Sequence, residues 1–233
     1  MTHSVISFDI DSAEPIARNF FLKYSGIETV TTKKVRMMER AELVLDQIRG
    51  SLNLKAVCLQ GIPDRFEGTE LVFLGQNFRC QAFDGIEKDT LRSVYAYALT
   101  TGAFTTGSEQ ILDQLYEDIW GTAFVDACRG LLREQLESGE TEKDPDVKLS
   151  QSFGPGYYGM EVGQTRLLGE LLPLDEIGMK INESGMMIPQ KSCTGLLFMV
   201  PKESPLPSSA CVECGINTAG CRFCDGFFGT PSA

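Results

Sequence analysis

Four cysteines near the C-terminus form the cluster in this sequence that is best suited to chemistry. Cys211 and Cys214 make one C-x-x-C pair and Cys221 and Cys224 make a second, with six residues between the pairs and Gly215 directly after the first. A C-x-x-C turn aims two sulfurs at one point, and glycine lets backbone N–H groups approach a sulfur closely. The cluster therefore predicts a metal centre held by four thiolates.

The spacing alone leaves the identity of that metal open. Four cysteine thiolates suit a 4Fe–4S cluster. They also suit a structural zinc ion, although the six-residue gap is shorter than the roughly 15–20 residues of common zinc sites with two such pairs. Redox-active thiols without a metal are a third interpretation.

His3 is the only histidine of the chain, and it lies close to the N-terminus. Nucleophilic schemes of the Ser-His-Asp or Cys-His type need an imidazole held in a formed pocket, so the sequence argues against them. It argues equally against histidine-rich zinc sites. Metal ligands in this chain are therefore expected to be mainly sulfur or carboxylate.

Composition limits the partners and the compartment. The 233 residues are 42% apolar, which is typical of a globular chain, and the net charge of −11 argues against nucleic acid or anionic lipid as a partner. No run approaches the roughly 18 apolar residues of a membrane span, and the first residues lack the pattern of a secretory signal. We therefore expect a cytoplasmic protein without membrane contact, in which thiols stay reduced.

Hydrophobic periodicity predicts an α+β fold, with a helical and mixed N-terminal region followed by an antiparallel sheet with helices and then the cysteine-rich metal-binding tail. Helices are expected at about 11–24, 34–50, 108–136 and 161–172, with Gly121 dividing the third. Strands are expected at 5–10, 55–60, 70–74, 93–101, 177–181 and 193–200. The polar run 139–148 predicts a linker between parts 1–138 and 149–200, and the tail covers 201–233.

Two further segments combine turn residues with side chains that suit a ligand. The first is S-F-G-P-G-Y-Y at 152–158, where glycines let backbone amides approach a ligand and a tyrosine ring can stack or hydrogen-bond. The second is E-S-G-M-M-I-P-Q-K-S-C-T-G at 183–195, which joins a carboxylate, a methionine pair and a proline turn. Either segment alone is also typical of an ordinary turn.

Taken together and in this order, the two segments resemble the S-adenosylmethionine-binding activation domain of cobalamin-dependent methionine synthase. That family shows an R-x-x-x-G-Y turn, an amphipathic helix and then an E-S-x-x-M-x-P-x-x-S-x-S-G element, which residues 152–157, 161–172 and 183–195 match here. The run G-T-A-F-V-D-A at 121–127 is similar to the family's helical G-S-A-A-V-E-A, with Asp126 at the acidic position. The resemblance spans roughly residues 5–200.

The resemblance implies a role in reductive repair, in which S-adenosylmethionine methylates the cobalt of a stalled cobalamin once an electron arrives. It implies that S-adenosylmethionine is bound by Asp126, Ser152, Gly154, Pro155, Gly156, Tyr157 and Glu183. The family's corrinoid motif, D-x-H-x-x-G, is absent, so cobalamin is expected on a partner, either a corrinoid-binding protein or a cobalamin-dependent methyltransferase. The implied need for an electron donor favours iron over zinc in the cysteine cluster.

One departure from the family pattern affects the ligand. The arginine of R-x-x-x-G-Y is Ser152 here, and a serine cannot replace the two charge-assisted bonds that a guanidinium makes to a carboxylate. Without compensation by another group, we expect affinity for S-adenosylmethionine to be about 10- to 150-fold lower. The alternative function is therefore a non-catalytic partner-binding module whose tail is shaped by structural zinc.

Overall fold

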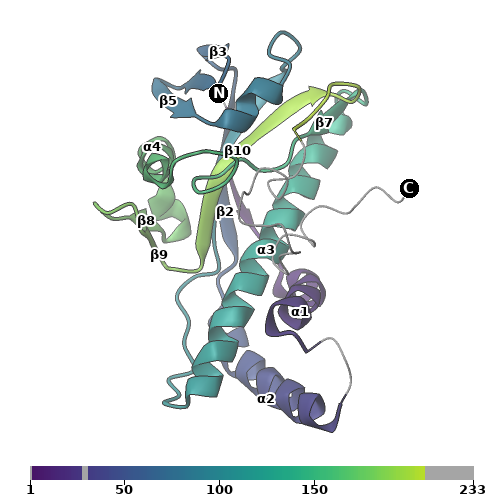
Figure 1. Ribbon diagram of the computed structural model, residues 1–233, viewed down its shortest axis with the longest axis vertical. Coiled ribbons are helices and arrows are strands. Elements are labelled where there is room, and N and C mark those ends of the chain that lie inside the picture. Colours follow the sequence, from purple (N-terminus) through teal and green to yellow (C-terminus); the bar gives the residue numbers. More distant parts are fainter. Residues whose placement is uncertain (1, 28–30, 208–233) are drawn as a thin grey trace.

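Figure 1 shows the computed structural model, which describes residues 2–27 and 31–207. Within these residues the α-helices are α1 (Ile10–Ser25), α2 (Thr32–Arg49), α3 (Ile111–Thr141) and α4 (Thr165–Leu171). The strands are β1 (Thr2–Ser7), β2 (Lys55–Gly61), β3 (Arg65–Glu67), β4 (Glu70–Phe73), β5 (Gln76–Arg79), β6 (Ser93–Thr100), β7 (Val147–Leu149), β8 (Lys180–Ile181), β9 (Met187–Ile188) and β10 (Ser192–Pro201). Short 3-10 turns occur at η1 (Gln81–Gly85), η2 (Val162–Gln164) and η3 (Leu174–Ile177).

A five-stranded antiparallel sheet forms the centre of the molecule, in the order β1-β2-β6-β10-β7. The predicted α+β class is confirmed. Strands from both sides of the predicted linker at 139–148 belong to this one sheet, since β7 and β10 pair with each other and β10 pairs with β6. The division of the chain into separate parts stays a prediction.

Both faces of the sheet are covered, which makes three layers. Alternate side chains of a strand point to opposite faces, and in β6 Tyr95, Tyr97 and Leu99 pack with the helices α1, α2 and α3. Val94, Ala96 and Ala98 pack instead with the small β3-β4-β5 sheet, α4 and η3. All eight residues of β6 are buried for this reason. Figure 1 shows α3 running along one side of the sheet, with α4, β8 and β9 on the other.

One tryptophan contacts all three helices of the helical layer. Trp120 of α3 is fully buried, and its ring stacks on Phe21 of α1 with the centroids 4.0 Å apart. Its indole N–H donates to the carbonyl of Ala41 in α2 at 2.9 Å. Trp120 thus contacts both α1 and α2, which are also joined to α3 by the contacts of Tyr24 with Asp126 and of Arg40 with Asp113.

The predicted interruption of α3 at Gly121 is wrong, because the helix is continuous from Ile111 to Thr141. Gly121 serves packing instead. A Cβ atom at this position would lie 2.6 Å from the Phe104 ring and 2.7 Å from the Lys191 side chain. The missing side chain lets these two groups rest directly on the helix.

The predicted strand at 177–181 is also wrong in extent, because η3 ends at Ile177 and only Lys180–Ile181 pair, with β9. The other predicted helices and strands are present with shifted ends. Cys211, Cys214, Cys221 and Cys224 lie outside the described residues. No helix of the described residues is long and apolar enough to cross a membrane.

Candidate functional site

A charged stripe on one side of α3 lines a cavity. Asp126, Arg129 and Arg133 are spaced three and four residues apart, which places them on the same side of the helix. They line a cavity of about 250 Å³, whose other walls come from α1, the strands β6, β7 and β10, and the segment after β7. This space, termed the α3 cavity, brings together Asp126 and Ser152, two predicted residues that belong to separate sequence motifs.

Asp126 is 9% exposed and is held from two sides. The Tyr24 hydroxyl donates to Oδ2 at 2.5 Å, and Arg129 Nη2 lies 3.2 Å from Oδ1. Burial raises the pKa of Asp126, while the Arg129 charge and the Tyr24 hydrogen bond partly offset that rise. A carboxylate fixed in this way, at the edge of a cavity, suits a cationic ligand group.

Arg129 brings a positive charge into the same cavity. Its side chain is 26% exposed, and it forms the ion pair with Asp126. Burial would lower the pKa of Arg129, but the surrounding Tyr97, Asp126, Cys193 and Tyr157 together raise it. The guanidinium therefore stays charged at every pH at which the protein folds.

Arg133 stabilises the cavity wall. Its guanidinium donates to the carbonyl oxygens of Ser150 at 3.2 Å and Leu149 at 3.0 Å, and lies 3.6 Å from Glu137. These bonds tie α3 to the end of β7 and to the segment that leads to Ser152. The role of Arg133 is thus to position the chain that closes the cavity.

Ser152 contacts Tyr97 across the cavity wall. The two hydroxyl oxygens lie 2.6 Å apart, and Tyr97 is fully buried in β6, where burial raises its pKa well above the ordinary value. Gly195 of β10 pairs with Tyr97, and a Cβ atom there would lie 2.8 Å from Ser152 Oγ. The absence of a side chain at Gly195 is what lets Ser152 lie against the sheet.

The glycine-proline turn after Ser152 has the geometry that its sequence predicts. The Tyr157 N–H donates to the Gly154 carbonyl at 3.0 Å, with Pro155 and Gly156 between them and Gly156 at φ +91°. Proline followed by a glycine with positive φ is typical of a type II turn. Gly154 packs on β10, where a Cβ would lie 2.9 Å from the Thr194 carbonyl oxygen.

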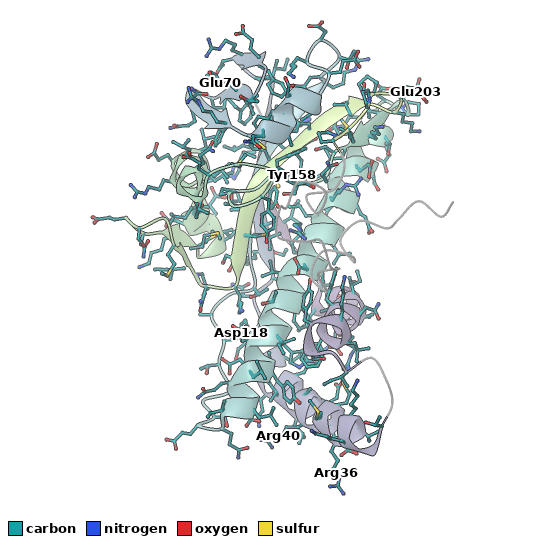
Figure 2. All side chains as sticks on the ribbon, in the orientation of Figure 1. Arg36, Arg40, Glu70, Asp118, Tyr158 and Glu203 are labelled. Atoms are coloured by element: carbon teal, nitrogen blue, oxygen red, sulfur yellow. The ribbon has the colours of Figure 1, made fainter. Side chains whose placement is uncertain are left out.

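The two tyrosines of this turn have different environments. Tyr157 is 61% exposed, and its hydroxyl lies near enough to Arg129 to contribute to that residue's raised pKa. Tyr158 is buried, with its ring 4.9 Å from Phe153, and Figure 2 shows it near the centre of the molecule. Ser152 lines the α3 cavity, but four residues of the turn that follows do not: Gly154, Pro155, Gly156 and Tyr157. Their contact with a ligand stays a prediction.

Glu183 lies apart from these residues. It is an exposed residue in the turn between β8 and β9, where the Asn182 side-chain oxygen accepts hydrogen bonds from the Ser184 and Met186 N–H groups. Glu183 does not line the α3 cavity. The structure thus gathers Asp126 and Ser152 and leaves Glu183 at a separate hairpin, and the predicted role of Glu183 remains untested.

The described cysteines do not form a metal centre. Within the described residues, 2–27 and 31–207, no group of three or more His, Cys, Asp or Glu side chains could hold a metal ion. Burial raises the pKa of the Cys58, Cys128 and Cys193 thiols to about 12. These thiols are therefore protonated and unreactive at neutral pH.

The chain after β10 returns to the α3 cavity. Leu206 lines it, and the Pro207 carbonyl accepts a hydrogen bond from the side chain of Gln151 at 2.7 Å. Cys211 follows Pro207 by four residues, which span at most about 14 Å when fully extended. The described part of the chain thus ends beside the α3 cavity, four residues before Cys211 in the sequence.

Arg129 and Tyr97 are two of the site residues that the sequence alone did not single out. Arg129 had a usable signal, because it follows Asp126 by three residues in a predicted helix and must share its face. Tyr97 had none, because an aromatic residue in an apolar strand is indistinguishable from ordinary core. Its contact with Ser152 depends on the pairing of β6 with β10.

The comparisons with known proteins identify the fold. No protein-family model matches the chain, and no curated protein matches it. Among solved structures, the chain is similar to the crystal structure of the MetH reactivation domain bound to AdoHcy, with a TM-score of 0.59 over 87% of this chain and 80% of that one. The two are 17% identical, so the likeness shows the fold alone. The fold implied by the sequence resemblance is confirmed.

Proposed function

We propose that the chain binds S-adenosylmethionine in the α3 cavity and uses it to reactivate a cobalamin carried by another protein. The observation that carries the proposal is the convergence of Asp126 and Ser152 on one cavity. Ser152 belongs to one of the two segments that resemble the activation domain, and Asp126 belongs to the run at 121–127 that is also similar to it. The fold is similar to that of a reactivation domain solved with AdoHcy.

The reaction is a methyl transfer that follows a one-electron reduction. Cobalt(II) on the partner takes one electron from a low-potential donor, such as a reduced flavin or iron–sulfur protein, and becomes cobalt(I). The cobalt(I) electron pair attacks the methyl carbon of the sulfonium. The S–CH₃ bond breaks, its electron pair stays on sulfur, and S-adenosylhomocysteine and methylcobalt(III) result.

The contribution of this chain is binding and orientation. The charges of Asp126 and Arg129 lie within 3.2 Å of each other at the cavity wall, where they can fix a ligand that carries both signs. Holding the methyl group toward a docked corrinoid makes the transfer effectively unimolecular. No proton moves in this reaction, so it needs no general acid or base. A chain whose only histidine is His3 is therefore compatible with it.

The cysteine cluster is assigned to the same function. Cys211, Cys214, Cys221 and Cys224 supply four thiolates, a donor set that fits a 4Fe–4S cluster or zinc. An iron–sulfur cluster would supply the one-electron chemistry that reduction of cobalt(II) needs. The proposed setting is the cytoplasm, with a corrinoid protein and an electron donor as partners.

The test is binding of S-adenosylhomocysteine, measured by calorimetry. The native chain is expected to bind it, and a side chain placed in the cavity should block binding. Gly130 lines the cavity, and a Cβ there meets nothing within 4 Å, so Gly130→Leu projects into the ligand space. Gly139→Leu is the matched control, since Gly139 lies in the same helix with equally open surroundings.

Both substitutions replace a helical glycine by a better helix former, so both variants should fold. Equal binding by both variants would show that the ligand does not occupy the α3 cavity. If the native chain binds S-adenosylhomocysteine but never accelerates methylation of any cobalt(II) corrinoid protein supplied with S-adenosylmethionine and reductant, the partner-binding alternative replaces reactivation.

A further inference from the structure

Arg129 and Asp126 form an ion pair whose two charges both face the α3 cavity. Arg129 Nη2 lies 3.2 Å from Asp126 Oδ1, and both residues line the cavity. The ion pair between Arg40 and Asp113 has a different arrangement, because it joins two elements, α2 and α3. The pair formed by Asp126 and Arg129 instead lies within one turn of α3, beside space for a ligand.

The neighbouring arginine shows the contrast. The Arg133 guanidinium is taken up by two backbone carbonyls and by Glu137, so its donors serve the cavity wall. Ser152 also lines the cavity, and its hydroxyl is bonded to that of Tyr97 and carries no charge. Among the described residues that line the cavity, the cations are therefore Arg129 and Arg133, and both come from α3.

We infer that Arg129 binds the α-carboxylate of the ligand and that Asp126 binds its α-ammonium group. This inference rests on the proposed function and names the residues that recognise the amino-acid end of the ligand. The guanidinium that the turn lacks at Ser152 is supplied from α3, which lines the same cavity.

The charge pattern supports this exchange of partners. A zwitterionic amino-acid group has no net charge, so its entry keeps both Asp126 and Arg129 compensated, which a buried charge requires. A guanidinium binds a carboxylate through two parallel N–H···O bonds, a geometry that a lysine or serine cannot reproduce. The Asp126 carboxylate is kept in place by the Tyr24 hydroxyl at 2.5 Å while its other oxygen turns to the ligand.

The test compares two ligands on two proteins by calorimetry. The ligands are S-adenosylhomocysteine and its decarboxylated analogue, S-adenosyl-3-thiopropylamine, which keeps the amine and loses the carboxylate. The native chain is expected to prefer S-adenosylhomocysteine by about 10- to 150-fold, as for a charge-assisted pair. Arg129→Gln should abolish that preference while the analogue still binds, because its amine contacts Asp126, which no longer pairs with Arg129.

Arg36→Gln is the control for the loss of one positive charge. Arg36 is exposed in α2, and Figure 2 shows it pointing outward at the end of the molecule. This variant should keep the full preference for the carboxylate. Arg129→Lys keeps the positive charge but cannot make two parallel hydrogen bonds to a carboxylate, so it should show an intermediate preference. This variant provides a second measurement if Arg129→Gln lowers the melting temperature of the protein.

The outcomes separate the inference from the proposed function. If native protein binds both ligands equally, or if Arg129→Gln keeps the preference, the carboxylate is recognised elsewhere and the inference is overturned while ligand binding stands. If native protein binds neither ligand, the proposed function fails and the inference fails with it. Loss of preference in Arg129→Gln together with continued binding of the analogue supports both.

Discussion

Gly195→Ala tests whether the segment that carries Ser152 truly lies against the sheet. The added Cβ would lie 2.8 Å from Ser152 Oγ, 2.9 Å from the Phe153 carbonyl oxygen and 3.2 Å from the Tyr97 ring. Two of these atoms cannot yield easily. Ser152 Oγ is bonded to the Tyr97 hydroxyl at 2.6 Å, and the Phe153 carbonyl accepts the Leu196 N–H at 2.8 Å. The segment must therefore move away from β10.

The expected loss in the free energy of unfolding follows from these contacts. Overpacking of this kind costs about 1–3 kcal/mol. Loss of the reciprocal bonds between Phe153 and Leu196 adds about 1 kcal/mol each where they break. The reduced entropy of the unfolded chain offsets about 0.4–1 kcal/mol. We expect a net loss of about 1–3 kcal/mol, which lowers the melting temperature by about 2–12 °C for a chain of this size.

The assay is urea unfolding followed by fluorescence, because the chain has one tryptophan and Trp120 is fully buried. Gly139→Ala is the control of opposite sign. It lies in α3 with nothing within 4 Å of the added atom, and it should stabilise the chain by about 0.5–1 kcal/mol. A Gly195→Ala variant that matches or exceeds native stability, while Gly139→Ala gains, would refute the close contact and the wall position of Ser152.

Two further predictions concern pH and metal. Burial raises the pKa of Glu14, but hydrogen bonds and charges from Arg49 and Arg18 lower it more, so the folded pKa lies below the unfolded one. As the pH falls, the unfolded chain therefore takes up the Glu14 proton before the folded chain does, and the stability that the ionised Glu14 contributes is lost. Glu14→Gln should reduce the urea midpoint at pH 7 and have a vanishing effect on it well below about pH 4. An equal effect at both pH values would contradict this. For the metal, anaerobically purified protein should contain iron and sulfide, and Cys214→Ser should lose both while keeping the native urea midpoint. Zinc in stoichiometric amount without iron would count against the iron–sulfur prediction.

The elements that the sequence predicted well are those with a strong hydrophobic pattern. The strand expected at 93–101 is β6, the central strand buried on both faces, where an unbroken apolar run leaves little choice. The elements that were missed are short. Strands β3, β5, β7 and β9 contain two to four residues, and partners elsewhere in the chain define them. Such strands carry too few residues for a periodic signal.

Gly121 shows why a local rule gave the wrong boundary. Glycine in a helix interior costs about 1 kcal/mol relative to alanine, which makes a break a reasonable expectation. The structure instead uses the missing side chain to seat Phe104 and Lys191 on α3. Those residues come from distant segments, so the tertiary contact that outweighs helix propensity has no trace in the local sequence.

The charge balance of the site was the hardest feature to predict. The sequence revealed that Ser152 lacks the charge of the arginine at the matching position, and that loss alone would favour a chain with weak ligand binding. Whether another cation compensates depends on which residues of α3 face Ser152, and only the packing of α3 on β6 and β10 decides this. Arg129 and Arg133 both line the cavity that Ser152 lines, and Arg133 donates to the backbone carbonyls of Leu149 and Ser150. We propose that Arg129, which forms the ion pair with Asp126, supplies the compensating charge, so that the departure at Ser152 is a relocation of charge within one cavity.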